Sequence, residues 1–389
     1  MAPIRLGFIG LSSTGWAAAA LVPPLLHPLL SDKYTITAIC TSSQTSAITT
    51  AEKYSKQFGH DIKAYYGPNG PEQISNDANV DMIAITVKMP LHLKLVTPAI
   101  EAGKDLFIEW TPGNGYAETL KIAEMIKKRG VRCLVGGQAK QSAALKVAKQ
   151  LLEDGKIGRV MSSTMVFGSG GSGDFKFWGP RIAAKDPYGA DINNGATLLT
   201  IPVGHNLVAL TDALGDFTEV TAAGTIRFPE PMLVDDHNQP TGKTIKSTTH
   251  DQVSVSGILS GKPYAEGAFV NIHCRSALLK NPGEKGEGRT LFKWIIDGED
   301  GAIEVSQREQ DGEIGCYISM TEKNVFLNGK EVPWEQNELN LLGNEGKAWF
   351  EFAKGDDGSY TTIDDAVRIH RVLDAALQSI QEGRRVTLT

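Results

Sequence analysis

The sequence predicts an α/β protein with an N-terminal domain built on a parallel sheet and a C-terminal α/β domain with a large, mainly antiparallel open sheet. Through the first third of the chain, short runs rich in Ile, Val, Phe and Tyr alternate with helical patterns. Strands that alternate with helices are typical of parallel βαβ units. From Val160 onward the runs are longer and alternate apolar with polar residues, which is typical of antiparallel strands.

The individual elements follow from apolar periodicity and from the turn residues between them. The first domain is predicted to contain strands at 4–11, 34–42, 62–67, 80–87, 105–110 and 131–137, and helices from about Gly15 and at 46–58, 90–104 and 116–130. The second is predicted to contain strands at 160–170, 217–228, 252–260, 266–276 and 290–306, and a final amphipathic helix at 362–385. Right-handed crossovers place the carboxyl ends of parallel strands at one edge, where ligands bind.

Composition and charge exclude several classes of function. The 389 residues are 41% apolar and carry a formal charge of −6 without a stripe of Lys or Arg, so direct binding to nucleic acid is not expected. The chain opens with a strand pattern instead of an export signal, and prolines interrupt its longest apolar run. We therefore expect a cytoplasmic protein without a membrane span. The four cysteines lie far apart, which indicates reduced core thiols and no metal site.

A glycine motif follows the first predicted strand. Gly10-x-Ser12-x-x-Gly15 has the spacing of the dinucleotide-binding fingerprint, with serine where the backbone approaches a pyrophosphate. A glycine turn that only packs a helix on the sheet is the structural alternative. We predict a Rossmann domain over residues 1–136 that binds a dinucleotide through Gly10, Ser12, Ser13, Thr14, Gly15 and Trp16.

The end of the second strand bears on the choice between NAD and NADP. Thr41 and Ser42 lie there, and no acid is present to accept the ribose hydroxyls. Hydroxyl side chains tolerate or bind a 2′-phosphate, which gives a slight preference for NADP over NAD, although no Arg or Lys is adjacent. Residues 137–389 are expected to carry the substrate and oligomerisation surfaces, with the last helix packing back toward the first domain.

Several longer stretches carry a family resemblance. They are IRLGFIGL, VDMIAITVKMPLHLKLVTPAIEAGKDLFIEW, QLLEDGKIGRV, NNGATLLTIPVGHNLVALTDAL, IIDGEDGAIEV and DDAVRIHRVLDAALQSIQEGRRVTL. Together they resemble the glucose-fructose oxidoreductase and inositol dehydrogenase family (Gfo/Idh/MocA) over nearly the whole chain. The resemblance implies an NAD(P)-dependent oxidoreductase acting on a sugar, polyol or related carbonyl compound. It also implies a homodimer or higher oligomer, because the open sheet of family members often forms subunit contacts.

Two departures from the family pattern concern catalysis. Family enzymes carry Glu-Lys-Pro, with the lysine between nicotinamide and substrate, where this sequence reads Glu-Trp-Thr from Glu109. They also carry Asp residues on both sides of a catalytic histidine, where this sequence has Ile201 and Val208 around His205. These features resemble a fungal branch that includes the galactose-regulon repressor, which binds NAD(P) and holds a transcriptional activator. A catalytically silent regulator with a protein partner, or a non-redox enzyme using bound NAD, therefore stays open beside an oxidoreductase.

The resemblance and the loop composition give a set of candidate residues. Catalysis is assigned to His205, Lys140 and Tyr188, which can exchange a proton with a carbonyl oxygen while hydride moves. Beyond the glycine loop, the cofactor residues are Thr41, Ser42, Thr86, His92, Glu109, Trp110 and Gln138. The substrate residues are Trp110, Lys140, Asp191, Asn194 and His205, which suit a polyhydroxylated small molecule. The stretch 168–195 is a candidate substrate loop.

Several of these residues also have a structural interpretation. Trp110 can stack on a nicotinamide or sugar face, or it can pack between domains. Glu109 can orient an amide or a ribose, and desolvation would raise its pKa. His92 can belong only to the first turn of its helix, His205 can pack a turn, and Asn194 can form one.

Overall fold

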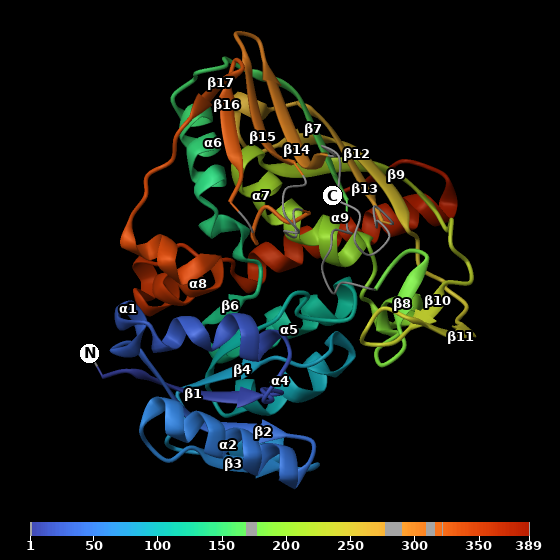
Figure 1. Ribbon diagram of the computed structural model, residues 1–389. Coiled ribbons are helices and arrows are strands. Elements are labelled where there is room, and N and C mark those ends of the chain that lie inside the picture. The colour runs from blue at the N-terminus through green and yellow to red at the C-terminus, as the bar shows by residue number, and fades with distance from the viewer. Residues whose placement is uncertain (1, 169–176, 277–289, 309–315, 321, 389) are drawn as a thin grey trace. The chain divides into compact units, whose positions relative to one another are not determined.

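The computed structural model describes residues 2–168, 177–276, 290–308, 316–320 and 322–388, which form two compact units. The first unit comprises Met1–Gln141 and Gln336–Val367, and the second comprises Ser142–Glu335 and Arg368–Thr389. Figure 1 shows both units, with elements labelled where there is room. Each unit is built on its own sheet, parallel in the first and mainly antiparallel in the second, which confirms the predicted fold class.

The first unit contains a six-stranded sheet with the strand order β3-β2-β1-β4-β5-β6, and all its strands run parallel. The strands are β1 (Ile4–Ile9), β2 (Tyr34–Thr41), β3 (Lys63–Tyr66), β4 (Met82–Ile85), β5 (Asp105–Ile108) and β6 (Cys133–Val135). The strand order changes direction between β1 and β4. This is the switch point, at which sheets of this kind bind ligands beyond the carboxyl ends of the strands.

Helices connect the parallel strands of the first unit. They are α1 (Pro28–Ser31), α2 (Gln44–Phe58), α3 (Gly70–Ser75), α4 (His92–Glu101) and α5 (Tyr116–Arg129). The unit also contains α8 (Gly343–Ala353), which comes from later in the chain. The helix predicted from about Gly15 is divided into a π-helical turn, Ala17–Leu21, a 3₁₀ turn, Pro23–Leu26, and α1. The prolines of this stretch have no N–H to donate, which explains why a continuous helix does not form.

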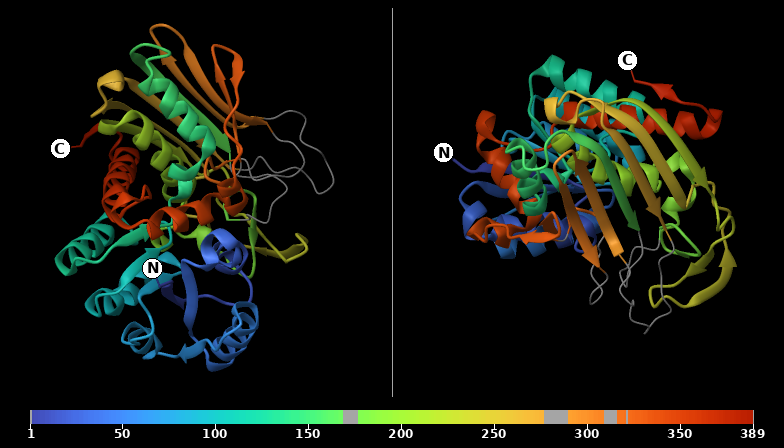
Figure 2. Two further views of the ribbon diagram at one scale, coloured as in Figure 1. Left: turned by 90° about the vertical axis from the view of Figure 1, so that its left-hand side faces the viewer. Right: turned by 90° about the horizontal axis from the view of Figure 1, so that it is seen from above.

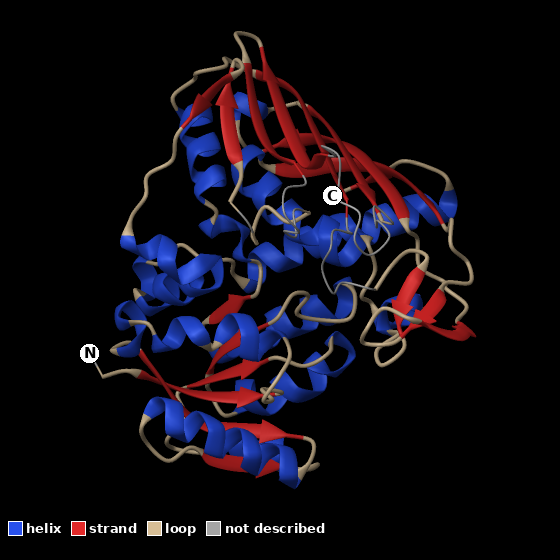
Figure 3. Cartoon of the chain, in the orientation of Figure 1, coloured by secondary structure: helices blue, strands red, loops and turns tan. Residues whose placement is uncertain are grey.

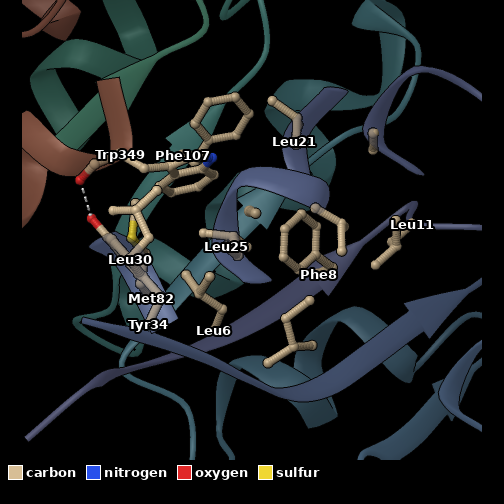
Figure 4. Packing of buried hydrophobic residues seen from close by; sticks show 14 of the residues in the cluster. Leu6, Phe8, Leu11, Leu21, Leu25, Leu30, Tyr34, Met82, Phe107 and Trp349 are labelled. Atoms are coloured by element: carbon tan, nitrogen blue, oxygen red, sulfur yellow. Dashed lines mark hydrogen bonds between the residues drawn. The ribbon is translucent and has the colours of Figure 1, made fainter. Parts of the chain in front are cut away.

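A buried aromatic cluster holds α8 against the sheet of the first unit (Figure 4). Trp349 of α8 is fully buried, and its ring centroid lies 4.8 Å from that of Phe107 and 5.4 Å from that of Tyr34. The Tyr34 hydroxyl also donates a hydrogen bond of 2.6 Å to the Trp349 carbonyl. This packing explains why residues 336–367 belong to the first unit although they follow most of the second in the chain.

The second unit contains a nine-stranded sheet ordered β17-β16-β15-β14-β7-β13-β12-β9-β18. Its strands are β7 (Val160–Gly168), β9 (Asp216–Thr225), β12 (Gln252–Ser260), β13 (Phe269–Arg275), β14 (Thr290–Gly298), β15 (Ala302–Arg308), β16 (Asn324–Leu327), β17 (Lys330–Val332) and β18 (Val386–Thr387). Neighbouring strands are antiparallel except β7 and β13, which run parallel. A smaller sheet joins β8 (Arg181–Ala183), β10 (Met232–Val234) and β11 (Pro240–Thr244).

One face of the nine-stranded sheet is covered by helices. These are α6 (Ala143–Glu153), α7 (Gly204–Leu214) and, from Arg368 onward, α9 (Ile363–Glu382), as Figures 2 and 3 show. Along β13 and its neighbours, buried side chains such as Ile272 alternate with half-buried ones. Because successive side chains of a strand point to opposite faces, the half-buried set marks the second face, which no described helix covers.

The structure also bears on the predictions of reduced core thiols and of a chain without a membrane span. All four cysteine side chains are buried thiols, in agreement with the predicted reduced core. Burial raises the pKa of the Cys40 thiol to about 11, so this thiol stays protonated at neutral pH. Within the described residues, no helix combines the length and the apolar character needed to cross a membrane.

Candidate functional site

The glycine loop begins where β1 ends. Gly10 has a φ of 102°, a conformation that glycine adopts readily and other residues rarely do. A Cβ atom on Gly10 would lie 2.8 Å from the Thr86 carbonyl oxygen and 2.5 Å from Val87 Cγ1, so a larger residue does not fit. Gly10 therefore lets the ends of β1 and β4 lie close together. Its lack of a side chain would also let the pyrophosphate of a dinucleotide approach the backbone closely.

The rest of the glycine loop faces solvent. Ser13, Thr14 and Gly15 are exposed, and Trp16 keeps 41% of its surface accessible. The Ser12 hydroxyl donates to the Thr14 carbonyl, and Gly15 has a φ of 96°, where a Cβ would meet the Ser12 hydroxyl oxygen at 4.0 Å. The π-helical turn follows directly, and the first N–H groups of a helical segment have no partner within it. The residues predicted for the phosphate site thus form one accessible loop.

The end of β2 presents hydroxyls and no carboxylate. The Thr41 hydroxyl donates a hydrogen bond of 2.9 Å to the Ser43 carbonyl, and Ser42 is exposed. The Ser43 side chain caps the N-terminus of α2. From within α2, Lys53 reaches the glycine loop, where its ammonium donates a hydrogen bond of 2.9 Å to the Ser13 carbonyl.

Thr86 and His92 shape the loop that follows β4. The N–H and the hydroxyl of Thr86 reach the Ile9 carbonyl at 2.9 and 3.2 Å. His92 is buried, and its two ring nitrogens each lie 2.9 Å from a carbonyl oxygen, one of Val87 and one of Thr111. Burial lowers the pKa of His92. This geometry gives His92 a structural role in joining the ends of β4 and β5, and contact with a cofactor stays a prediction.

Glu109 and Trp110 follow β5 along the same edge of the sheet. Trp16 Nε1 donates a hydrogen bond of 3.0 Å to Glu109 Oε1, which ties the glycine loop to this strand end. Glu109 as a whole is half-buried, but its carboxyl group is enclosed. Burial raises the pKa of that carboxyl to about 8, to which the charge of Glu345 also contributes, so Glu109 is protonated at neutral pH. Trp110 is buried, and its peptide bond to Thr111 is cis.

Lys140 and Gln138 lie in the short helix Gln138–Gln141 after β6. Gln138 is buried. Lys140 Nζ lies 2.7 Å from Asp365 Oδ2 in the first turn of α9, and both side chains are largely buried. Asp365 also accepts a hydrogen bond of 2.9 Å from the Thr362 N–H. The ion pair fixes the position of the Lys140 ammonium.

His205 lies in the first turn of α7, in the second unit. Its imidazole meets the Tyr317 ring edge to face, with 5.3 Å between centroids and 84° between planes. The neighbouring Asn206 holds the Tyr317 segment through two hydrogen bonds. Its side-chain amide donates one of 2.8 Å to the Cys316 carbonyl and accepts one of 3.1 Å from the Ile318 N–H. Burial lowers the pKa of His205 to about 4, so the imidazole is neutral at physiological pH.

The loop after β8 is held by local turns. Asp191 Oδ1 accepts hydrogen bonds from the N–H and the side-chain amide of Asn193, both of 3.0 Å. The Asn194 side-chain amide donates a hydrogen bond of 3.0 Å to the Tyr188 carbonyl. These contacts agree with the turn interpretation, and substrate contacts by Asp191 and Asn194 stay predictions. Residues 169–176 of the predicted substrate loop lie outside the described residues.

The first unit brings the predicted cofactor residues to one edge of its sheet. The glycine loop, Thr41, Ser42, Thr86, Glu109, Trp110 and Gln138 follow the ends of β1, β2, β4, β5 and β6. Sequence reasoning missed Lys53, Asp365, Tyr317 and Asn206. Of these, only Asn206 left a signal in the sequence, as a polar residue between His205 and the apolar run 207–210. The other three contact their partners, Ser13, Lys140 and His205, through packing between segments that are distant in the sequence.

Two family models match successive parts of the chain. The oxidoreductase family with an NAD-binding Rossmann fold (GFO_IDH_MocA) matches residues 4–137, which include the glycine loop and Glu109. The C-terminal domain of Gal80p (Gal80p_C-like) matches residues 144–307, which include His205. The change from one model to the other falls near the start of the second unit.

The chain is similar to proteins of two functional kinds. "Dehydrogenase aclE" from Aspergillus oryzae is 29% identical, over 98% of this chain and 97% of its own length. The galactose/lactose metabolism regulatory protein GAL80 of Saccharomyces cerevisiae is 26% identical, over 100% of this chain and 95% of its own length. The structure of a super-repressor mutant of Gal80p from the same yeast superposes with a TM-score of 0.82 at 21% identity, covering 100% of this chain and 98% of that one.

The contact between His205 and Tyr317 generates a prediction. Tyr317→Ala opens the imidazole to water, so we expect the pKa of His205 to rise from about 4 toward its ordinary value of 6.5. Tyr317→Phe keeps the ring and should keep the low pKa. The measurement is an NMR titration of the imidazole, with His205→Gln to identify its resonance.

A matched control comes from another tyrosine of the same unit. Tyr264 donates its hydroxyl to the Ala213 carbonyl at 2.7 Å, and Tyr264→Ala should leave the pKa of His205 unchanged. If Tyr317→Ala also leaves that pKa near 4, the Tyr317 ring is not what shields His205.

Proposed function

We propose that this chain is a member of the Gfo/Idh/MocA oxidoreductase family and that it transfers hydride between a nicotinamide cofactor and a sugar, polyol or related carbonyl compound. In this proposal residues 1–136 bind the cofactor and residues 137–389 provide the substrate and oligomerisation surfaces, with the cytoplasm as the expected location. The observation that carries the proposal is the glycine loop, in which Gly10 leaves no room for a Cβ and the following residues are exposed.

Groups of the first unit suit each part of the cofactor. The loop from Gly10 to Gly15 offers backbone N–H groups to the phosphates. Thr41 and Ser42 lie at the strand end that meets the adenosine ribose in Rossmann domains, and the lack of a carboxylate there favours NADP. A bound nicotinamide supplies or accepts the hydride. Trp110 offers a flat apolar surface to a ring.

The proton must come from a group other than the lysine of the family motif, because Trp110 stands at its position and exchanges no proton. His205 is neutral, so it can accept the hydroxyl proton during alcohol oxidation and return it during carbonyl reduction. Lys140, held by Asp365, provides a fixed positive charge for a developing alkoxide. Tyr188 is the third candidate, since a phenol can donate to the same oxygen.

A catalytically silent regulator is the second candidate function. Two observations favour it, namely the match of residues 144–307 to the Gal80p C-terminal domain and the tryptophan in place of the lysine. In this case the bound cofactor would control the binding of a protein partner, and no substrate would turn over.

Cofactor titration followed by a turnover screen separates the two candidates. We expect NADPH to quench the tryptophan fluorescence of the purified protein at lower concentration than NADH. We also expect oxidation or reduction of the cofactor with at least one sugar, polyol or small ketone. Tight binding without turnover would favour the regulator, and the absence of binding by either cofactor would contradict both candidates.

Variants of the proposed acid/base residues test the chemistry. His205→Ala should lower kcat by about 10²- to 10⁴-fold, the usual contribution of general acid–base catalysis. Lys140→Ala should lower kcat as well, whereas Lys140→Arg keeps the charge and should retain part of it. His237→Ala, which changes an exposed histidine of the same unit, should have no effect. Full activity of His205→Ala would overturn its assignment.

We also propose that the chain forms a homodimer or higher oligomer through the face of the nine-stranded sheet that no described helix covers. Phe269 lies on this face at the start of β13 and is 49% exposed, and Asn271 and His273 follow it on the same side. Phe269→Glu should lower the mass measured by light scattering to that of a monomer, whereas Met232→Glu in the small sheet should not. A monomeric unmodified protein would contradict the proposal.

A further inference from the structure

Lys53 is a lysine of α2 whose charge the glycine loop holds in place. Its Nζ donates a hydrogen bond of 2.9 Å to the carbonyl of Ser13, next to the serine at the second position of the glycine motif. Its ammonium also lies 5.0 Å from the centroid of the Tyr54 ring. Within the described part of the chain, no carboxylate forms an ion pair with Lys53. The positive charge is therefore not neutralised by a neighbouring acid.

The surroundings of Lys53 suit an anion. A Rossmann domain that uses NAD commonly places an acid at the end of β2 to bind both ribose hydroxyls, and one that uses NADP places a cation nearby. Here Thr41 and Ser42 bring hydroxyls to that strand end, and Ser13 lies in the loop after β1, the strand next to β2 in the sheet. Lys53 adds the cation that the residues directly after β2, Ser42 and Ser43, do not provide.

We propose that Lys53 binds the 2′-phosphate of the adenosine half of NADP(H) and thereby selects NADP(H) over NAD(H). This inference rests on the proposed function, because it requires that the glycine loop bind a dinucleotide. An ammonium has three N–H donors, and the Ser13 carbonyl takes one of them, so two can reach a phosphate. A charge-assisted hydrogen bond of this kind is worth on the order of 10- to 100-fold in affinity.

The test uses fragments of the cofactor that differ only in the 2′-phosphate. Adenosine 2′,5′-bisphosphate and 5′-AMP are titrated calorimetrically into the full chain and into Lys53→Met, Lys53→Arg and Lys56→Met. Lys56 lies in the same helix and is exposed, so its variant matches the loss of charge. We expect Lys53→Met to weaken binding of the bisphosphate by about 10- to 100-fold and to leave 5′-AMP unchanged. Lys53→Arg should keep most of the preference, and Lys56→Met all of it.

Three outcomes would count against the inference, and they differ in what they overturn. If Lys53→Met weakens both nucleotides equally, Lys53 only supports the loop through Ser13. If it changes neither affinity, Lys53 does not contact the phosphate. If the unmodified protein binds neither fragment and neither NADPH nor NADH, the proposed function itself is wrong.

Discussion

The hydrogen bond from the Trp16 indole to Glu109 joins the two segments on which the candidate cofactor site depends, the glycine loop and the end of β5. Burial raises the pKa of the carboxyl that accepts this bond from 4.5 to about 8. The folded protein therefore keeps a proton that the unfolded chain loses above about pH 4.5. Because the folded state binds more protons in this interval, the free energy of unfolding falls as the pH rises from about 4.5 to about 8.

The residues proposed to bind the cofactor and the histidine proposed as acid/base lie in different units of the chain. The first unit forms its loop through Gly10, Thr86 and Glu109, and none of these contacts involves the side chain of the residue after Glu109. The second unit positions its own histidine, because Asn206 holds the Tyr317 segment against His205. A chain can therefore keep the fold and the cofactor while its reactivity changes, which agrees with a dehydrogenase and a regulator both being similar to it.

The sequence predicted those parts of the structure that depend on local pattern. The alternation of strand and helix patterns predicted the parallel sheet, and the spacing of the glycines predicted the loop at the end of β1. The helix predicted from about Gly15 starts near that residue, but the structure divides it into short helical segments, because the prolines of this stretch have no N–H to donate. Contacts between distant segments had no local signal. The ion pair of Lys140 with Asp365 spans 225 positions, and Lys53 reaches the loop only because α2 packs beside it.

The protonation state of Glu109 is the most direct test of this account. Infrared difference spectra between the protein and Glu109→Gln, recorded across a pH series, isolate the carbonyl band of the protonated carboxyl. The account predicts that this band is present at neutral pH and disappears with a midpoint of about 8. Its absence at neutral pH, with the carboxylate bands already present near pH 6, would show that the glycine loop is tied to β5 by an ionised group, contrary to the account.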